Sequence, residues 1–314
     1  MQAKTVSVGP VTAAVTNQVA ASQTPNAGQI VLNGAGAVFS IDNIAAAQDP
    51  AGAGNLTLAA SPVTLPQARY IYVTSAADDT GINFTVTGTD INGRPLTEVI
   101  AGANTKAAVS VNRFIAVSNV AVSGNSGSVQ VGSFVNATFT GSTARQVTIV
   151  AAGNESANTF VVTGTDVNGT VFSETVAGPN ATTATTNSYF LSVISVTISG
   201  NAAGALTVGM TNTASSPLVR FDDFAPSNIS IQCNVTGSAT YTVQSTLDDP
   251  NDPFTPVAIS AMQWVNTSDT NVVAATTTQQ SNFLFAPKFA RVILTTTSTG
   301  SVASTFLQSS NGPK

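Results

Sequence analysis

The chain has 314 residues, enough for two to four compact domains of ordinary size. Charged residues make up only 8%, against roughly 25% in average soluble domains, so Thr, Ser, Asn, Gln and Gly must cover most of the surface. The net charge is −5 and the ten basic residues are scattered, which argues against a nucleic-acid partner because no basic stripe can neutralise successive phosphates.

No run of about 18 apolar residues occurs, so we expect no membrane-spanning segment. The first residues also lack the apolar stretch of a secretory signal peptide, and we expect no export by that route. Thr and Val are abundant whereas Glu, Lys and Arg are scarce, and this balance favours strands over surface helices. Regularly spaced Val, Ile and Phe oppose disorder, so the composition predicts an all-β fold with negligible helix.

Residues 1–65 are rich in Ala, Gly and Asn, and most of the first 25 lack any periodicity. We interpret the region as an extended N-terminal arm followed by a small β region, the arm becoming ordered on a partner. Weak strand patterns occur at residues 29–32, 38–41 and 55–58.

An internal repeat dominates the middle of the chain. The stretch Phe84-Thr-Val-Thr-Gly-Thr-Asp-Ile-Asn-Gly93 recurs as Phe160-Val-Val-Thr-Gly-Thr-Asp-Val-Asn-Gly169, an offset of 76 residues. Residues 69–124 and 145–200 share 20 identities over 56 ungapped positions, far above chance. We therefore expect two homologous β repeats, at 66–136 and 137–212.

Each repeat predicts a hairpin. Apolar and hydroxyl-bearing residues alternate up to Thr89, and Asp90-Ile-Asn-Gly93 then supplies a turn before the chain returns as a partner strand. We expect Gly93 and Gly169 to adopt backbone conformations that disfavour a Cβ. Short strands at about ten-residue spacing are typical of β-sandwich-like domains or small barrels.

Residues 213–314 differ from the repeats and predict a C-terminal β domain. Its expected strands lie at 229–235, 240–245, 283–285, 291–295 and 302–307. Cys233 alternates with Ile229 and Ile231, which indicates a buried small residue rather than a reactive thiol. Trp264, the only tryptophan, is better explained as a core or interdomain anchor than as a ligand platform.

Candidate chemistry is sparse. The chain has no histidine, which excludes Ser-His-Asp and Cys-His arrangements and any familiar catalytic zinc site. Adjacent carboxylates on a strand point to opposite faces, so the neighbouring pairs are interpreted as solvated turn residues. These pairs are Asp78 with Asp79, Asp222 with Asp223, and Asp248 with Asp249.

The pairs Asp90 with Asn92 and Asp166 with Asn168 resemble part of a calcium loop. The remaining ligands of an EF-hand are missing, and a turn-stabilising Asx side chain is the better account. Among these weak calcium candidates, the acidic segment at 248–252 is the best. We expect no catalytic, cofactor-binding or metal-binding residues, and no enzyme.

Charged residues also recur between the repeats. Glu98 matches Glu174, and Arg69 matches Arg145. A duplicated acid and base suggest an intradomain ion pair or an inter-subunit contact, because two catalytic centres would need further convergent groups.

The motifs Val-Thr-Gly-Thr-Asp-X-Asn-Gly and Glu174-Thr-Val-Ala-Gly-Pro-Asn180, with the closing Ser-Gly and Val-Gly, resemble modules of structural proteins from tailed bacteriophages. The segment Thr246-Leu-Asp-Asp-Pro250 with Trp264 and Ala290-Arg-Val-Ile is similar to the C-terminal parts of such virion proteins. The resemblance covers roughly residues 66–310 and carries no catalytic residue.

The resemblance implies a virion structural protein, assembled in the host cytoplasm, that binds the major capsid protein or other virion proteins. A capsid decoration or head-fibre protein is the leading reading. A tail tube or adaptor component and a receptor-binding or carbohydrate-binding surface module are the alternatives. Sparse charge leaves sheet edges poorly guarded, so we also expect a homo-oligomer. The preference for a homotrimer comes from the resemblance.

Overall fold

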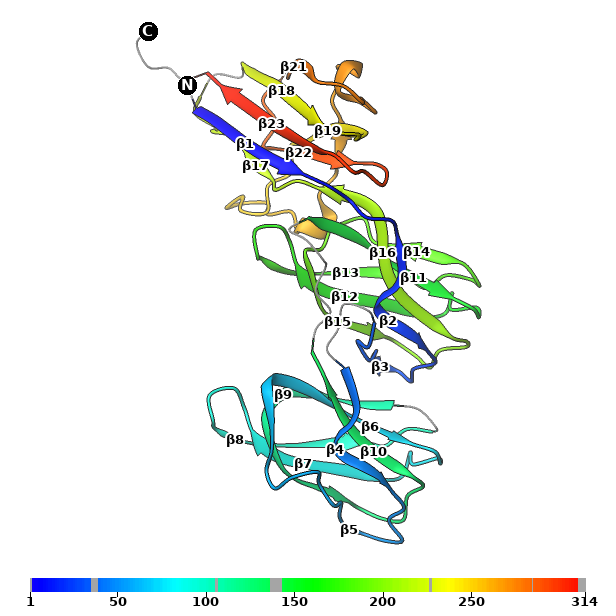
Figure 1. Cartoon of the computed structure of the whole chain (residues 1–314). Coiled ribbons are helices and arrows are strands. Elements are labelled where there is room, and N and C mark those ends of the chain that lie inside the picture. The colour runs from blue at the N-terminus through cyan, green and yellow to red at the C-terminus, as the bar shows by residue number, and fades with distance from the viewer. Residues whose placement is uncertain are drawn as a thin grey trace.

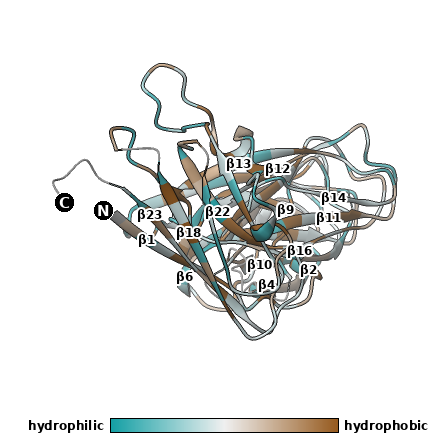
Figure 2. Cartoon of the chain, turned by 90° about the horizontal axis from the view of Figure 1, so that it is seen from above, coloured by the Kyte–Doolittle hydropathy of each residue, from teal (hydrophilic) through white to brown (hydrophobic). Residues whose placement is uncertain are grey.

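A computed structural model describes residues 2–34, 39–104, 107–135, 143–225, 228–283 and 285–309. These residues form antiparallel sheets throughout, which confirms the expected all-β fold. The helical elements among them are two single 3₁₀ turns, η1 (Ile259–Ala261) and η2 (Thr270–Val272). Three β domains are stacked end to end in an elongated molecule (Figure 1). Viewed from above, the strands alternate between hydrophobic and hydrophilic segments (Figure 2).

The domain at one end contains the first repeat. Its sheet has the order β4-β10-β6-β9-β7-β8, with β5 paired to β9. The strand β9 pairs with β6 through its first part and with β7 through its second, so that one strand passes from one layer to the other. The two layers enclose a core that includes Ile44, Ile71 and Phe114. The bounds are β4 (Phe39–Gln48), β5 (Gly54–Asn55), β6 (Val63–Ser75), β7 (Asn83–Thr89), β8 (Pro95–Ala101), β9 (Ala107–Val122) and β10 (Val129–Phe134).

The middle domain contains the second repeat, and its hairpin has the same pairing as the first. Val162 faces Glu174 as Val86 faces Glu98, and both repeats have an irregularity just before the glycine at 88 or 164. In the second repeat the counterpart of β9 is divided into β14 and β15, which belong to different sheets. The bounds are β11 (Ala144–Ala151), β12 (Thr159–Thr165), β13 (Val171–Ala177), β14 (Thr183–Thr185), β15 (Ser192–Ile198) and β16 (Leu206–Ser215).

Both hairpin glycines have the expected conformation. Gly93 has φ +75° and Gly169 has φ +82°, and the backbone N–H of each donates to the carbonyl of the aspartate at the start of its turn. The turn prediction is therefore confirmed in both repeats.

The C-terminal domain is a sandwich of two layers. One is the sheet β1-β23-β18-β21, and the other is formed by β17, β19, β20 and β22. Ile231 and Phe306 from the first layer share a core with Tyr241 and Val292 from the second. The expected strands lie within or beside β18, β19, β22 and β23. Of the strand expected at 283–285, Phe283 ends β21, residue 284 lies outside the described residues and Phe285 is not in a strand. The bounds are β17 (Val219–Arg220), β18 (Ile229–Thr236), β19 (Tyr241–Thr246), β20 (Val265–Asn266), β21 (Gln279–Phe283), β22 (Phe289–Leu294) and β23 (Ser301–Gln308).

The N-terminal segment is extended, but it is not a free arm. Its first strand, β1 (Gln2–Val8), pairs along its whole length with the last strand, β23. β2 (Val15–Gln23) then pairs with β16 and β3 (Gly28–Gln29) with β15, and β4 pairs with β10 in the first repeat. The segment therefore runs the length of the molecule and adds a strand to every domain, as Figure 1 shows in blue. These strands pair with other strands of the same chain, so their order does not require a partner protein.

This path changes how the domain boundaries are understood. Residues 1–65 do not form a unit of their own, because their strands belong to three different domains. The boundary expected after residue 212 falls inside β16, whose last residues, Ala214 and Ser215, pair with β22 of the C-terminal domain. Of the weak patterns in the segment, Val38 lies outside the described residues, and residues 56–58 follow β5 without being a strand.

Aromatic side chains join the first repeat to the middle domain. Tyr70, Tyr72 and Phe134 belong to the same buried cluster as the core of the middle domain. Tyr72 stacks on Phe39 with ring centroids 5.0 Å apart, and its hydroxyl donates to the Ser40 carbonyl at 3.0 Å. Burial raises the pKa of Tyr72 well above its ordinary value, with a smaller effect from Asp42. The contact between these two domains is therefore largely apolar.

Candidate functional site

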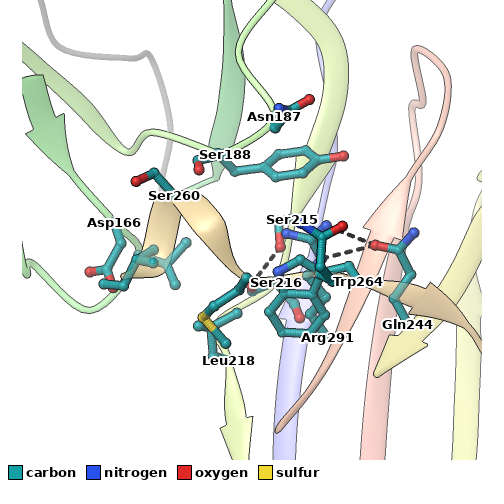
Figure 3. A pocket seen from close by; sticks show the side chains of 15 residues that line it. Asp166, Asn187, Ser188, Ser215, Ser216, Leu218, Gln244, Ser260, Trp264 and Arg291 are labelled. Atoms are coloured by element: carbon teal, nitrogen blue, oxygen red, sulfur yellow. Dashed lines mark hydrogen bonds between the residues drawn. The ribbon is translucent and has the colours of Figure 1, made fainter. Parts of the chain in front are cut away.

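A pocket lies where the middle domain meets the C-terminal domain. Its cavity of about 300 Å³ is at the lower end of the range of small-ligand sites, about 300–1,000 Å³. The middle domain contributes the hairpin turn at 166–167 and the loop at 187–189, and the C-terminal domain contributes residues 259–264 and two strands (Figure 3). The linking residues 215–218 form the remaining wall.

Arg291, on β22, is the charged centre of this pocket. Its side chain is held between two aromatic rings, with the guanidinium carbon 4.1 Å from the Trp264 ring centroid and 4.9 Å from that of Tyr189. Nε and Nη2 both donate to Oε1 of Gln244, at 2.9 and 2.8 Å. Burial lowers the pKa of Arg291 to about 10, and the nearby Tyr189 opposes this shift. The guanidinium therefore stays positive at neutral pH.

The stack also ties two domains together. Tyr189 belongs to the second repeat, whereas Arg291, Trp264 and Gln244 belong to the C-terminal domain. Such cation–π contacts are worth about 0.5–2 kcal/mol, more when the cation is desolvated. The interpretation of Trp264 as an interdomain anchor agrees with this geometry, and its ring is only half-buried.

Hydrogen bonds to carboxylates shape the wall from the middle domain. Glu174, which is buried, accepts from the backbone N–H of Asn187 at 2.6 Å and of Ser188 at 2.9 Å. Oδ1 of Asp166 accepts from the N–H groups of Asn168 and Thr170, both at 2.8 Å. These bonds fix the two loops that face the pocket.

The opposite wall is the segment around η1, and it is anchored in the same way. Oδ2 of Asp248 accepts from the backbone N–H of Gln263 at 2.6 Å, next to Trp264. Met262 is buried and lines the cavity. Asp248, the first residue of the acidic segment at 248–252, therefore positions this wall of the pocket.

The recurring charges do not form the ion pair proposed from the sequence. Glu98 accepts from the backbone N–H groups of Val111 and Asn112, which are the counterparts of Asn187 and Ser188 in the second repeat. Arg145 instead donates to oxygens of the N-terminal segment, including the Thr12 hydroxyl at 2.9 Å and the Ala13 carbonyl at 3.0 Å. Glu174 supports a loop, Glu98 supports the middle of β9, and Arg145 holds the N-terminal segment against the middle domain.

The neighbouring carboxylates do not gather into one centre. Asp78 and Asp222 each accept a backbone N–H two residues ahead, as turn residues do. Asp79 is buried at 1% exposure, so the solvated interpretation is wrong for this residue. Asp249 is also buried, and it pairs with Arg220 at 2.9 Å. Asp223 forms ion pairs with Arg220 at 3.6 Å and with Lys288 at 2.8 Å.

The remaining candidates from the sequence are the calcium-loop residues and the single cysteine. Oδ1 of Asp90 accepts from Asn92 and Arg94 as an Asx turn does, and the described residues contain no group of three or more possible metal ligands. Cys233 is buried in the C-terminal core as expected, and burial raises the pKa of its thiol.

Sequence reasoning found Trp264 but missed Arg291, Tyr189 and Gln244. One difference between the repeats was visible in the sequence, where Tyr189 stands at the position that Arg113 has in the first repeat. The pocket presents one guanidinium, one carboxylate and several hydroxyl and amide groups, a set suited to holding a polar ligand by charge and hydrogen bonds.

No known family model matches the chain, and no curated protein is similar to it at a significant level. Within the part of the chain that the structure describes, no helix is both long and apolar enough to cross a membrane.

Proposed function

We propose that this chain is a non-catalytic structural component of a phage virion, a capsid decoration or head-fibre protein that binds the particle surface. The motifs of the two repeats and of the C-terminal region support the class of protein. The observation that carries the proposal is the path of the N-terminal segment, which adds a strand to each of the three domains.

A particle protein must keep its domains in line while one end is held. Here the domains are connected by more than single linkers, because the strands of residues 2–48 pair with strands that lie more than 80 residues away in sequence. Neighbouring domains are thus joined by two stretches of chain and by the apolar and stacked contacts between them. Such an arrangement favours a fixed rod over a set of independently moving modules.

The C-terminal domain offers a surface for attachment. Phe224 and Phe254 are 92% and 90% exposed, which is unusual for side chains of this size. Arg220 pairs with Asp223 at 3.6 Å and with Asp249 at 2.9 Å, so the loop that carries Phe224 lies beside the start of the segment that leads to Phe254. We propose that the particle binds these two exposed phenylalanines and the charged groups beside them.

Purified virions test the proposal. Mass spectrometry should detect the chain, and an antibody against it should label the heads in negative-stain images. Labelling of the tail would replace the head assignment by a tail tube or adaptor component. Absence from virions of an infected culture that synthesises the chain would refute the proposal.

The oligomeric state is a separate expectation. Light scattering of the purified chain should give about three times the 31.6 kDa chain mass, since we propose a homotrimer. A stable monomer at micromolar concentration would refute self-association, and a hexameric ring would favour a tail component.

A surface module that binds a receptor or carbohydrate is the second candidate. One observation favours it, namely the polar pocket around Arg291 and Trp264.

A further inference from the structure

The guanidinium of Arg291 carries a buried charge that the protein does not neutralise. Only 8% of the residue is exposed, and its hydrogen-bond acceptor is the neutral amide oxygen of Gln244. The ion pairs among the described residues lie elsewhere, around Asp223 and Asp249. Burying a charge without a counter-charge is unfavourable, so a nearby anion would be bound with a matching gain.

One nitrogen of this guanidinium is left to make a new bond. Nε and Nη2 are both used by Gln244, whereas Nη1 has no hydrogen-bond partner among the described residues. Nη1 is not fully enclosed and retains some accessible surface. An anion in the pocket can therefore accept a charge-assisted hydrogen bond from it.

The far side of the pocket has a different character. Asp166 lies on the side away from Gln244 (Figure 3). Its Oδ1 is used by its own turn, but its Oδ2 accepts no hydrogen bond from the described residues. The hydroxyls of Ser188 and Ser260 also line the cavity without a hydrogen bond to another described residue. These groups suit a ligand that donates and accepts through several hydroxyls.

We propose that this pocket binds a carboxylate-bearing sugar, with the carboxylate at Arg291 and the ring hydroxyls towards Asp166, Ser188 and Ser260. The carboxylate satisfies Nη1 and supplies the missing counter-charge. The negative Asp166 favours hydroxyl donors at its end and disfavours a second anionic group there. A cavity of about 300 Å³ suits one sugar unit, such as the end of an acidic polysaccharide.

The inference concerns the isolated chain and does not depend on its place in a virion. Binding can be measured on purified protein, so its failure would leave the virion proposal standing, and the reverse also holds. It deepens the second candidate function by naming the class of ligand.

The single tryptophan provides a direct measurement. Because Trp264 is the only tryptophan in the chain and lines the pocket, intrinsic fluorescence reports on this site alone. Titration of the full chain with D-glucuronate should change the emission saturably. D-Glucose and the uncharged methyl ester of glucuronic acid should bind at least about tenfold more weakly, the loss expected when a charge-assisted hydrogen bond is removed. Acetate should also bind at least about tenfold more weakly, since it cannot reach Asp166.

Each other result overturns a stated part of the proposal. Equal binding of the methyl ester or glucose would overturn the role of the carboxylate at Arg291, and equal binding of acetate would overturn recognition of a sugar. No saturable change with glucuronate or with N-acetylneuraminate, a larger carboxylated sugar, would overturn the site itself. These comparisons use the unaltered chain and need no variant to fold.

A pair of variants adds a test of the residue. Arg291→Met keeps an unbranched apolar stem and removes the charge, so glucuronate binding should fall at least about tenfold in a variant that retains the β-sheet circular dichroism of the unaltered chain. Arg113→Met is the matched control, because Arg113 lies 5.9 Å from the Tyr70 ring in the first repeat, far from the pocket in sequence and fold. Its affinity for glucuronate should equal that of the unaltered chain. Unchanged affinity in a folded Arg291→Met variant would overturn the assignment.

Discussion

The path of the N-terminal segment predicts that three nearby positions in sequence stabilise three different domains. Val8 is buried in the core of the C-terminal domain, Val19 in that of the middle domain and Ile44 in that of the first repeat. Each is at most 2% exposed. Truncating these side chains one at a time should therefore loosen one domain at a time.

The magnitude follows from the atoms removed. Val8→Ala and Val19→Ala each delete two buried methyl groups, worth about 0.8 kcal/mol each, and leave a small cavity, so we expect about 2 kcal/mol of local destabilisation. Ile44→Val deletes one, and about 1 kcal/mol is expected. Since 1.4 kcal/mol corresponds to a factor of ten, amide exchange through opening of the affected domain should accelerate about 30-fold for the two valines.

Hydrogen exchange followed by mass spectrometry resolves these effects by peptide. Val8→Ala should accelerate exchange in β18 and β23, whereas Ile44→Val should act on β6 and β10. Ser7→Ala is the control, because Ser7 lies beside Val8 on β1 but is exposed. Unchanged exchange in β23 after Val8→Ala would refute the pairing of β1 with that strand. Equal acceleration in all three domains would show that they open together.

Four further outcomes follow from single residues. Gly164→Ala should destabilise the chain by about 1–3 kcal/mol in urea denaturation, since a Cβ there would lie 2.0 Å from the Ser192 carbonyl oxygen. Gly169→Val should destabilise the chain by about 1 kcal/mol or more through its positive φ alone, because no atom lies within 4 Å of the added Cβ; an unchanged denaturation midpoint would contradict the turn. Glu174→Gln should cost about 1–3 kcal/mol by weakening two charge-assisted hydrogen bonds, read as a lower thermal midpoint. Cys233 should resist alkylation at pH 8 until denaturant is added, because burial raises its pKa; rapid labelling of the native chain would contradict its place in the core.

The hairpins could be predicted from the sequence because their determinants are local. Alternation of side chains defines β7 and β12, and Asn-Gly at 92–93 and 168–169 sets the turn between each strand and its partner. Once the turn is fixed, the register of the hairpin follows from it. The same holds for β18, where Ile229, Ile231 and Cys233 alternate towards the core.

The N-terminal strands could not be predicted, because their structure depends on distant partners. Gln2–Val8 has little apolar alternation, and among residues 3–8, whose burial the structure describes, only Val8 is fully buried. Its strand conformation comes from pairing with β23, about 300 residues away along the chain. β2 has two register shifts against β16, which obscures a period of two in its sequence.

The pocket was hidden for a related reason. Tyr189, Trp264 and Arg291 come from three separated parts of the chain and meet only because β16 leads from the second repeat into the C-terminal sheet. A lone arginine in a strand normally indicates an exposed position, and the apolar run Phe289-Ala-Arg-Val-Ile-Leu294 around Arg291 was the one sign of a buried strand. The sequence identified Trp264 as an anchor but could not identify Arg291, the residue that its ring contacts.

The N-terminal segment determines which strands lie at the edges of the sheets. The strands β10, β15, β16 and β23 would each leave a free edge within the described sheets if residues 2–48 were absent, and β4, β3, β2 and β1 cover them. The strands β1, β3 and β4 then end their sheets in turn, so the unpaired backbone groups of these edges lie on the N-terminal segment, in a chain with only four lysines to guard them. The outer strands β8 and β13 are still at sheet edges, and Val99 and Val171 on them are 58% and 60% exposed. If subunits pair through strands, these are two of the edges open to a second copy, together with β1, β3, β4, β14, β20 and β21, which also end their sheets.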